Sequence, residues 1–218
     1  EKGDNMNLVI FDMDGTLVDS GKAITNTINT TRKELNLKPN LKSDFIVKII
    51  NDPTKNYIKE FYPGIIPSQK LMDRFEVLFR QNYEKYAKTY CDIKYLLEKL
   101  KNENIAMAIA SNAPSKSLKK ILKKLEIFEY FDYIIGFDEE NPKKPDPTML
   151  IKIINHHSKN NKSFKTIFIG DSLKDKAASS NAKIQYLHAN WGFGKGLMQG
   201  VNTPNEALNY ILNYFYQN

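Results

Sequence analysis

Two aspartates that directly follow a short apolar run could do chemistry together. Asp12 and Asp14 stand two residues apart, and Gly15 after them permits a tight turn. Two carboxylates at this spacing, at the end of a strand, can both point at one centre. A turn that is merely rich in Asp and Gly would look similar, but the five-residue pattern D-x-D-G-T rarely arises by chance in a chain of this length.

Polar side chains of complementary kinds follow three later apolar runs. They are, in chain order, Ser111 with Asn112, Lys144, and Asp171 with Asp175. The hydroxyl and the amide can donate hydrogen bonds to an anion, although both residue types also cap helices. Pro145 restrains the backbone beside Lys144. Because ligands of open α/β sheets bind beyond the carboxyl ends of the strands, we expect these groups to converge with Asp12 and Asp14.

Short apolar runs, typical of buried strands, alternate with helical patterns along most of the chain. The predicted strands cover residues 7–11, 105–110, 133–136, 166–169 and 184–187, and helical patterns include 118–125, 150–154 and 205–216. This alternation predicts an α/β fold with a doubly wound, Rossmann-like parallel sheet that is covered by helices on both faces.

The segment between the first strand and the rest of the sheet lacks this alternation. It holds four helical patterns, at residues 23–35, 43–50, 55–61 and 68–86. We therefore predict an all-α domain of residues 21–88 inserted into a core of residues 6–20 and 89–218. Residues 1–5 precede the first methionine and are interpreted as a remnant of cloning.

With these residues, the sequence resembles the haloacid dehalogenase superfamily of phosphotransferases. The resemblance rests on DMDGTLVDS at 12–20, on Ser111-Asn112, on KPDP at 144–147 and on GDSLKD at 170–175. It covers the whole chain, and the helical block is similar to the cap of the phosphoglycolate phosphatase-like branch. The resemblance implies a magnesium-dependent phosphatase that works through an aspartyl-phosphate.

The residue types agree with that chemistry. Asp12 is the candidate nucleophile, and Asp14 can protonate the leaving alkoxide and then activate water. Ser111, Asn112 and Lys144 would bind the phosphate oxygens. Mg²⁺ prefers oxygen ligands, so the predicted metal site consists of Asp12, Asp171, the backbone carbonyl that the resemblance implies for Asp14, and Asp175, which is expected to orient a metal-bound water.

Departures from the family pattern concern mainly the cap. Relatives usually carry a glycine-containing specificity loop where this chain has residues 49–55, and Asn51 and Asp52 replace that glycine. Asn51, Thr54 and Lys55 are the predicted substrate contacts. Near the last motif, Lys183 stands where the family usually has a glycine, which concerns a turn and not the chemistry.

Composition excludes several other classes of protein. The chain has 218 residues, one cysteine and no apolar run long enough to span a bilayer. We expect a cytoplasmic monomer or homodimer without a membrane partner. The net charge is +7, but only three of the 32 basic residues are arginines. This favours a solvated basic surface over nucleic-acid binding, so the expected partner is a small phosphorylated metabolite.

Three alternatives stay open beside hydrolysis of a phosphoglycolate-like or sugar phosphomonoester. A sugar phosphomutase of the β-phosphoglucomutase kind would use the same aspartates but return the phosphoryl group to a sugar. A pyrophosphatase would share the whole site. A non-catalytic protein that binds a phosphorylated ligand belongs to a different class, and it would have no need of Asp12, Asp14, Lys144 and Asp171 together.

Overall fold

The computed structural model describes residues 6–52, 54–159 and 163–217, so the interpretation of residues 1–5 lies outside the described part. The chain forms two compact units, with the divisions after Leu17 and before Thr89. The helical unit therefore begins three residues earlier than the expected boundary at residue 21. None of the described helices is long and apolar enough to cross a membrane.

A five-stranded parallel sheet forms the centre of the α/β core, in the order β5-β4-β1-β6-β7. Its strands are β1 (Leu8–Phe11), β4 (Ala106–Pro114), β5 (Tyr133–Phe137), β6 (Thr166–Gly170) and β7 (Gln185–His188). The first strand lies in the middle, and the chain winds outward on both sides of it. This confirms the predicted doubly wound sheet.

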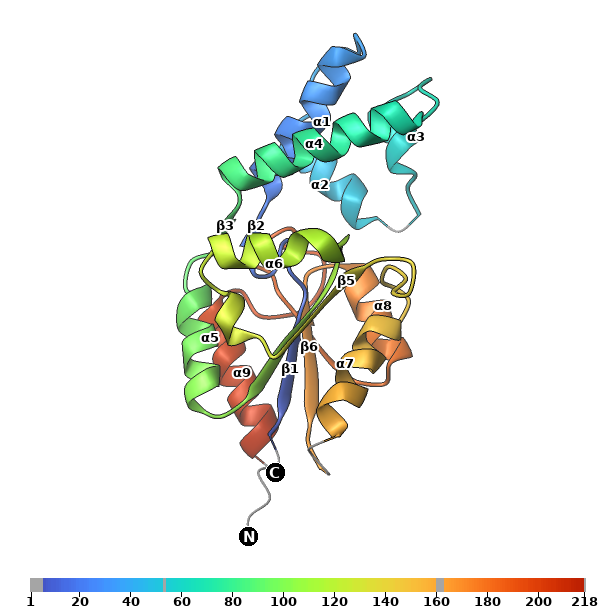
Figure 1. Cartoon of the computed structure of the whole chain (residues 1–218). Coiled ribbons are helices and arrows are strands. Elements are labelled where there is room, and N and C mark those ends of the chain that lie inside the picture. Colours follow the sequence, from blue (N-terminus) through green and yellow to red (C-terminus); the bar gives the residue numbers. More distant parts are fainter. Residues whose placement is uncertain (1–5, 53, 160–162, 218) are drawn as a thin grey trace. The chain divides into compact units, whose positions relative to one another are not determined.

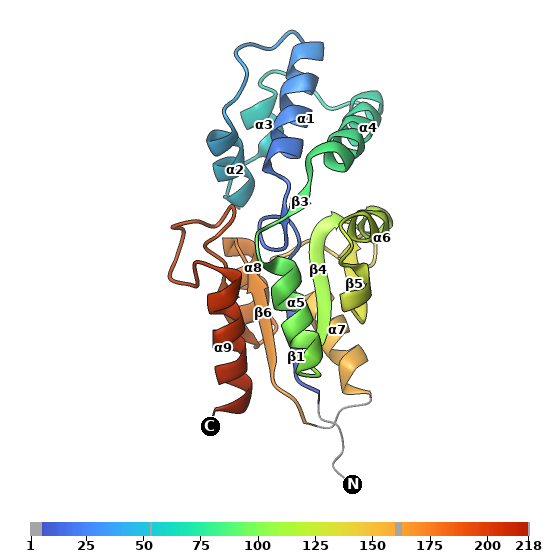
Figure 2. The ribbon, with the colours of Figure 1, turned by 90° about the vertical axis from the view of Figure 1, so that its left-hand side faces the viewer.

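Helices cover both faces of this sheet, as Figures 1 and 2 show. One face carries α5 (Ile93–Asn102) and α9 (Pro204–Tyr216), and the opposite face carries α7 (Thr148–Ser158) and α8 (Leu173–Asn181). A further helix, α6 (Ser115–Lys124), packs on β4 and β5, and a short 3₁₀ turn spans Phe128–Tyr130. Leu8, Ile10 and Phe168 are fully buried within this layered core.

The strand register places the predicted chemical groups at one edge of the sheet. Phe11 pairs with Ile109 on β4 and with Ile169 on β6. The backbone N–H of Asp12 donates to the carbonyl of Ile169 at 2.8 Å. The residues that follow these three paired positions therefore lie at the same level of the sheet.

The β4 strand runs further than predicted. It continues to Pro114, so Ser111 and Asn112 lie within the strand and not after its end. The pairing with β5 shifts between Ser111 and Pro114, which is a local irregularity that re-aims these side chains. Pro114 is the N-cap of α6, so neither Ser111 nor Asn112 caps that helix.

The helical unit contains α1 (Gly21–Glu34), α2 (Ser43–Asn51), α3 (Tyr57–Phe61) and α4 (Gln69–Tyr86). The third helix begins two residues later than predicted because the Asn56 side chain caps it, accepting hydrogen bonds from the N–H groups of Ile58 and Lys59. Two short strands, β2 (Val18–Asp19) and β3 (Lys88–Thr89), pair where the chain leaves and re-enters the α/β core.

The helical unit combines a buried apolar cluster with an apolar pocket that is open to its surface. Ile28, Ile46, Ile49 and Phe61 form the buried cluster. The apolar pocket of about 400 Å³, lined partly by Ile28, Phe61 and Phe75, lies beside it. Several of the apolar side chains that line this pocket are exposed, so burial of apolar surface stabilises the unit less and its polar anchors carry more of its stability.

Arg32 is such an anchor. It is 4% exposed, and its guanidinium donates to the backbone carbonyls of Phe61, at the end of α3, and of Pro39, at 2.9 Å in the second case. These two carbonyls belong to the segment after α1 and to the end of α3. The side chain therefore ties α1 to both segments.

We expect Arg32→Met to lower the free energy of unfolding by about 2–4 kcal/mol, because two buried carbonyls lose charge-assisted hydrogen bonds. Urea unfolding followed by circular dichroism measures the change. The matched control is Arg80→Met on α4, since Arg80 is exposed and its replacement should change stability by less than about 0.5 kcal/mol. Equal stability of the two variants would contradict the role of Arg32.

Candidate active site

The turn after β1 brings Asp12 to the edge of the sheet. The backbone N–H groups of Thr16 and Leu17 both donate to the carbonyl of Met13, at 3.3 and 2.9 Å, which closes the turn. Gly15 has φ +86°, and a Cβ atom there would lie 2.2 Å from Oδ2 of Asp171. The turn therefore needs glycine, both for its backbone angle and for the close approach of the Asp171 carboxylate.

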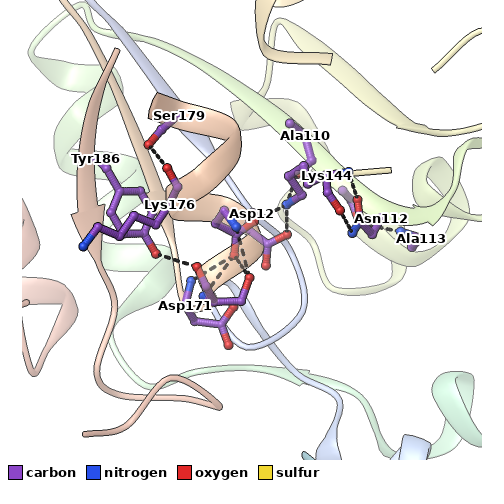
Figure 3. Close-up of polar contacts among 12 residues, drawn as sticks. Asp12, Ala110, Asn112, Ala113, Lys144, Asp171, Lys176, Ser179 and Tyr186 are labelled. Carbon is purple, nitrogen blue, oxygen red and sulfur yellow. Dashed lines mark hydrogen bonds and ion pairs between the residues drawn. The ribbon is translucent and has the colours of Figure 1, made fainter. Parts of the chain in front are cut away.

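Lys144 is the cation at the centre of the site. Its ammonium lies 2.5 Å from Oδ1 of Asp12, 2.6 Å from Oδ1 of Asp175 and 2.8 Å from the carbonyl of Ala110. The side chain is almost fully buried, and Figure 3 shows it pointing toward Asp12. An ammonium has three protons, and each of them has a protein acceptor here.

Asn112 holds the backbone of Lys144. Its Oδ1 accepts from the N–H of Lys144 at 2.8 Å, and its Nδ2 donates to the carbonyl of Lys144 at 3.2 Å (Figure 3). The predicted contact of Asn112 with phosphate stays a prediction, because the hydrogen bonds that the structure gives this amide go to the lysine. The neighbouring Ser111 is buried, and its Oγ accepts from the N–H of Ala113 at 3.0 Å, which leaves the hydroxyl proton for an anion.

Asp171 and Asp175 follow β6 and open α8. The Ser172 side chain and Asp175 form a capping box at this helix, in which Oδ2 of Asp175 accepts from the Ser172 hydroxyl at 2.6 Å. The same oxygen accepts from the N–H of Asp171 at 3.3 Å. Asp175 is thus held at both oxygens, by the helix end and by Lys144. Oδ2 of Asp171, in contrast, is buried without a hydrogen-bond partner among the described residues.

Three carboxylates could hold one metal ion. Asp12, Asp171 and Asp175 each place an oxygen so that these atoms lie within 4.8 Å of one another, and all three residues are buried. Their formal charge of −3 faces one ammonium, and the hard oxygen donors are those that Mg²⁺ prefers. The unpartnered oxygen of Asp171 fits the same interpretation. The described residues are therefore suited to a divalent cation.

Burial and mutual repulsion shift the pKa values of these groups. Burial is the main cause that raises the pKa of Asp12 to about 7, against the opposing effect of Lys144. Burial and the neighbouring carboxylates also raise the pKa of Asp171 well above its ordinary value. Burial by itself would lower the pKa of Lys144, but Asp12 and Asp175 raise it, so this residue stays an ammonium. A cation bound here would favour the ionised carboxylates.

Asp14 and the predicted cap residues are placed less directly. Asp14 is half-buried and close enough to raise the pKa of Asp12, but its carboxylate is not one of the three that could share an ion. In the helical unit, Asn51 ends α2 and Thr54 hydrogen-bonds to Oδ1 of Asp52 at 2.6 Å. Lys55 lies 3.6 Å from Glu60. The substrate contacts of these three residues stay predictions.

The site residues predicted from the sequence do not include a set of residues that contact the turn after β1. Trp191 donates from Nε1 to the carbonyl of Thr16 at 2.8 Å, and His188 is buried between Tyr186 and Gly194. Only the pattern WGFG at 191–194 could have indicated them, because a histidine at a strand end is ordinarily part of the core. These residues connect the end of β7 to the turn that carries Asp12.

Comparisons with known proteins agree with this geometry. The family model described as haloacid dehalogenase-like hydrolase matches residues 9–189. A phosphoglycolate phosphatase of Aquifex aeolicus is 32% identical over 194 residues, with 87% of each chain covered. Another, of Psychrobacter arcticus, is 28% identical and covers 92% of this chain and 90% of its own.

Solved structures show the same fold. A hydrolase of the haloacid dehalogenase-like family from Streptococcus pneumoniae has a TM-score of 0.76 and 26% identity, and covers 95% of this chain and 99% of its own. The expected resemblance and the Rossmann-like core are thereby confirmed, as is the expectation of a phosphatase-type enzyme. The chain belongs to the haloacid dehalogenase-like hydrolase family.

Proposed function

We propose that this protein is a Mg²⁺-dependent phosphatase that hydrolyses a small phosphomonoester through an aspartyl-phosphate on Asp12. The observation that carries the proposal is the group of three buried carboxylates around one ammonium. Three carboxylates beside a single ammonium are costly to bury unless a further cation binds among them. Asp12 and Asp171, with the backbone carbonyl of Asp14, would hold Mg²⁺, and the bound ion would withdraw charge from the phosphoryl oxygens.

Asp12 is the nucleophile of the proposed reaction. One of its carboxylate oxygens forms a bond to phosphorus as the bond from phosphorus to the ester oxygen breaks. Lys144, bonded to Asp12, favours the ionised carboxylate that this step requires. Ser111 can donate its hydroxyl proton to a phosphoryl oxygen as negative charge develops there.

Asp14 is the acid and base. It gives a proton to the leaving alkoxide in the first step, and it takes a proton from water when that water attacks phosphorus in the second. The bond between phosphorus and Asp12 then breaks, which releases inorganic phosphate and restores both carboxyl groups.

The helical unit is proposed to select the substrate through Asn51, Thr54 and Lys55. Relatives named as phosphoglycolate phosphatases support a small anionic phosphomonoester, and a cationic side chain such as Lys55 suits an anionic substrate. The cytoplasmic location and the monomeric or homodimeric state stay predictions from the sequence.

The first test is release of inorganic phosphate from phosphoglycolate, sugar phosphates, nucleotides and pyrophosphate, with Mg²⁺ and with EDTA. We expect release from at least one phosphomonoester, abolished by EDTA and restored by excess Mg²⁺, because the carboxylate group requires a cation. Isomerisation of a sugar phosphate without release would favour the mutase, and preference for pyrophosphate the pyrophosphatase. Binding without any turnover would contradict the enzymatic proposal.

Asp12→Asn should lower kcat by roughly 10⁴-fold or more, since an amide cannot form the phosphorylated intermediate. The matched control is Asp73→Asn, which changes an exposed carboxylate on α4 and should leave kcat unchanged. Acid-quenched wild-type protein should carry phosphate on the peptide that contains Asp12. Turnover by Asp12→Asn close to that of the wild type would refute the mechanism.

Binding of Mg²⁺ should strengthen as pH rises through about 7. The raised pKa of Asp12, about 7, means that the cation must displace a proton at lower pH, so the dissociation constant should change by about tenfold per pH unit for each proton released. Calorimetric titration in buffers of different ionisation enthalpy counts those protons. A dissociation constant that is constant between pH 5 and 8 would contradict the shifted pKa.

A further inference from the structure

The segment after β7, residues 191–194, lies against both acidic turns of the site. Trp191 donates to the carbonyl of Thr16 in the turn after β1. A Cβ atom on Gly192 would lie 2.0 Å from the carbonyl oxygen of Gly15, and one on Gly194 would lie 2.2 Å from that of Asp171. Backbone therefore packs directly on backbone at both turns, so a shift of this segment must move one or both of them.

The same segment confines the Asp171 carboxylate. The place that a Cβ of Gly15 would occupy is 2.2 Å from Oδ2 of Asp171 and 2.8 Å from Cδ2 of Phe193. This oxygen has no hydrogen-bond partner among the described residues. The Gly15 turn therefore lies close to both this oxygen and the Phe193 ring, so a shift of residues 191–194 would alter the space around the carboxylate.

His188 anchors the segment to the sheet. It lies at the end of β7, is 2% exposed, and its Nε2 is 2.9 Å from the carbonyl of Gly194. A carbonyl only accepts, so Nε2 carries the proton. Nδ1, 3.1 Å from the hydroxyl of Tyr186, is then the acceptor. Burial also lowers the pKa of His188, which favours the neutral ring that this pattern needs.

This arrangement does not suit His188 as a metal ligand or a proton carrier. Both ring nitrogens are engaged with protein groups, and the carboxylates that could share an ion are those of Asp12, Asp171 and Asp175. The ring instead connects Tyr186 and Gly194. The Tyr186 hydroxyl in turn lies 3.4 Å from the carbonyl of Ser172, beside the metal-site carboxylates.

We propose that His188 is a positioning residue which, through its hydrogen bond to Gly194, holds residues 191–194 against the Gly15 turn and Asp171 and so sets the affinity of the site for Mg²⁺. The inference rests on the proposed magnesium site. It predicts that changes at His188 or Gly192 weaken metal binding, although neither residue is among the three whose carboxylates could share the ion.

The test measures binding of Mg²⁺ by calorimetry with MgCl₂ alone, without substrate. His188→Leu removes both hydrogen bonds and should raise the dissociation constant by about tenfold or more. His188→Gln offers an amide donor to Gly194 and should restore much of the affinity. His156→Leu, which changes an exposed histidine on α7, is the matched control and should bind as the wild type does.

Fluorescence gives a second readout that does not depend on the metal. Trp191 is the only tryptophan, so the emission reports on residues 191–194 alone. We expect His188→Leu and Gly192→Ala to shift the emission to the red, because the indole loses its contact with Thr16, and His188→Gln to keep it close to that of the wild type. A merely structural histidine would lower the melting temperature without this pattern of rescue.

The outcomes separate the two proposals. If the wild type binds no Mg²⁺, the proposed magnesium site fails, and this inference with it. If the wild type binds and both His188→Leu and Gly192→Ala bind equally well, only the positioning role is overturned. Should His188→Leu fail to fold, Trp191→Phe keeps an aromatic ring but loses the Nε1 donor. Unchanged affinity in that variant would overturn the role of the segment.

Discussion

The Lys144 ammonium is the interaction on which the rest of the site depends. It is shared by Asp12 after β1, Asp175 on α8 and the carbonyl of Ala110 on β4, so one cation connects three separate elements. Without it, buried carboxylates would lie close together with no compensating charge, and at least one of them would have to be protonated. The ammonium thus holds the carboxylates close together, but its single positive charge does not balance the formal charge of −3 on Asp12, Asp171 and Asp175.

Contacts to the backbone fix much of the geometry of the site. Asn112 fixes the main chain of Lys144, and Gly15 and Gly192 let neighbouring turns approach more closely than any other residue would allow. The capping box at Ser172 both starts α8 and orients Asp175. Local folding signals and the placement of reactive groups are therefore the same interactions here.

Much of the fold and of the site could be predicted from the sequence. The five strands of the core sheet follow from short apolar runs, and convergence of Asp12, Lys144 and Asp171 follows from parallel strands ending at one edge. The helix α8 was harder to predict, because LKDKAASSN has no apolar stripe and is held by its cap. Lys183 takes φ +57° in the turn where the family usually has glycine, so the turn survives the substitution.

What could not be predicted depends on contacts between segments distant in the sequence. No local pattern indicates that Trp191 donates to Thr16, or that both Oδ1 and Nδ2 of Asn112 bond to the backbone of Lys144. The extension of β4 to Pro114 likewise depends on its pairing with β5. The spacing of residues along the sequence identifies the side chains that can react, whereas packing between distant segments decides which residues position them.

The ends of the inserted helical unit have a consequence for how such proteins can diverge. The N–H of Tyr90 donates to the carbonyl of Leu17 at 3.1 Å, so the points where the chain leaves and re-enters the core are already hydrogen-bonded to each other. Closing the chain across this gap needs only a short turn, whatever lies beyond it. The insertion point is therefore a junction at which evolution or a designer can exchange one inserted unit for another while the α/β core keeps its strand pairing.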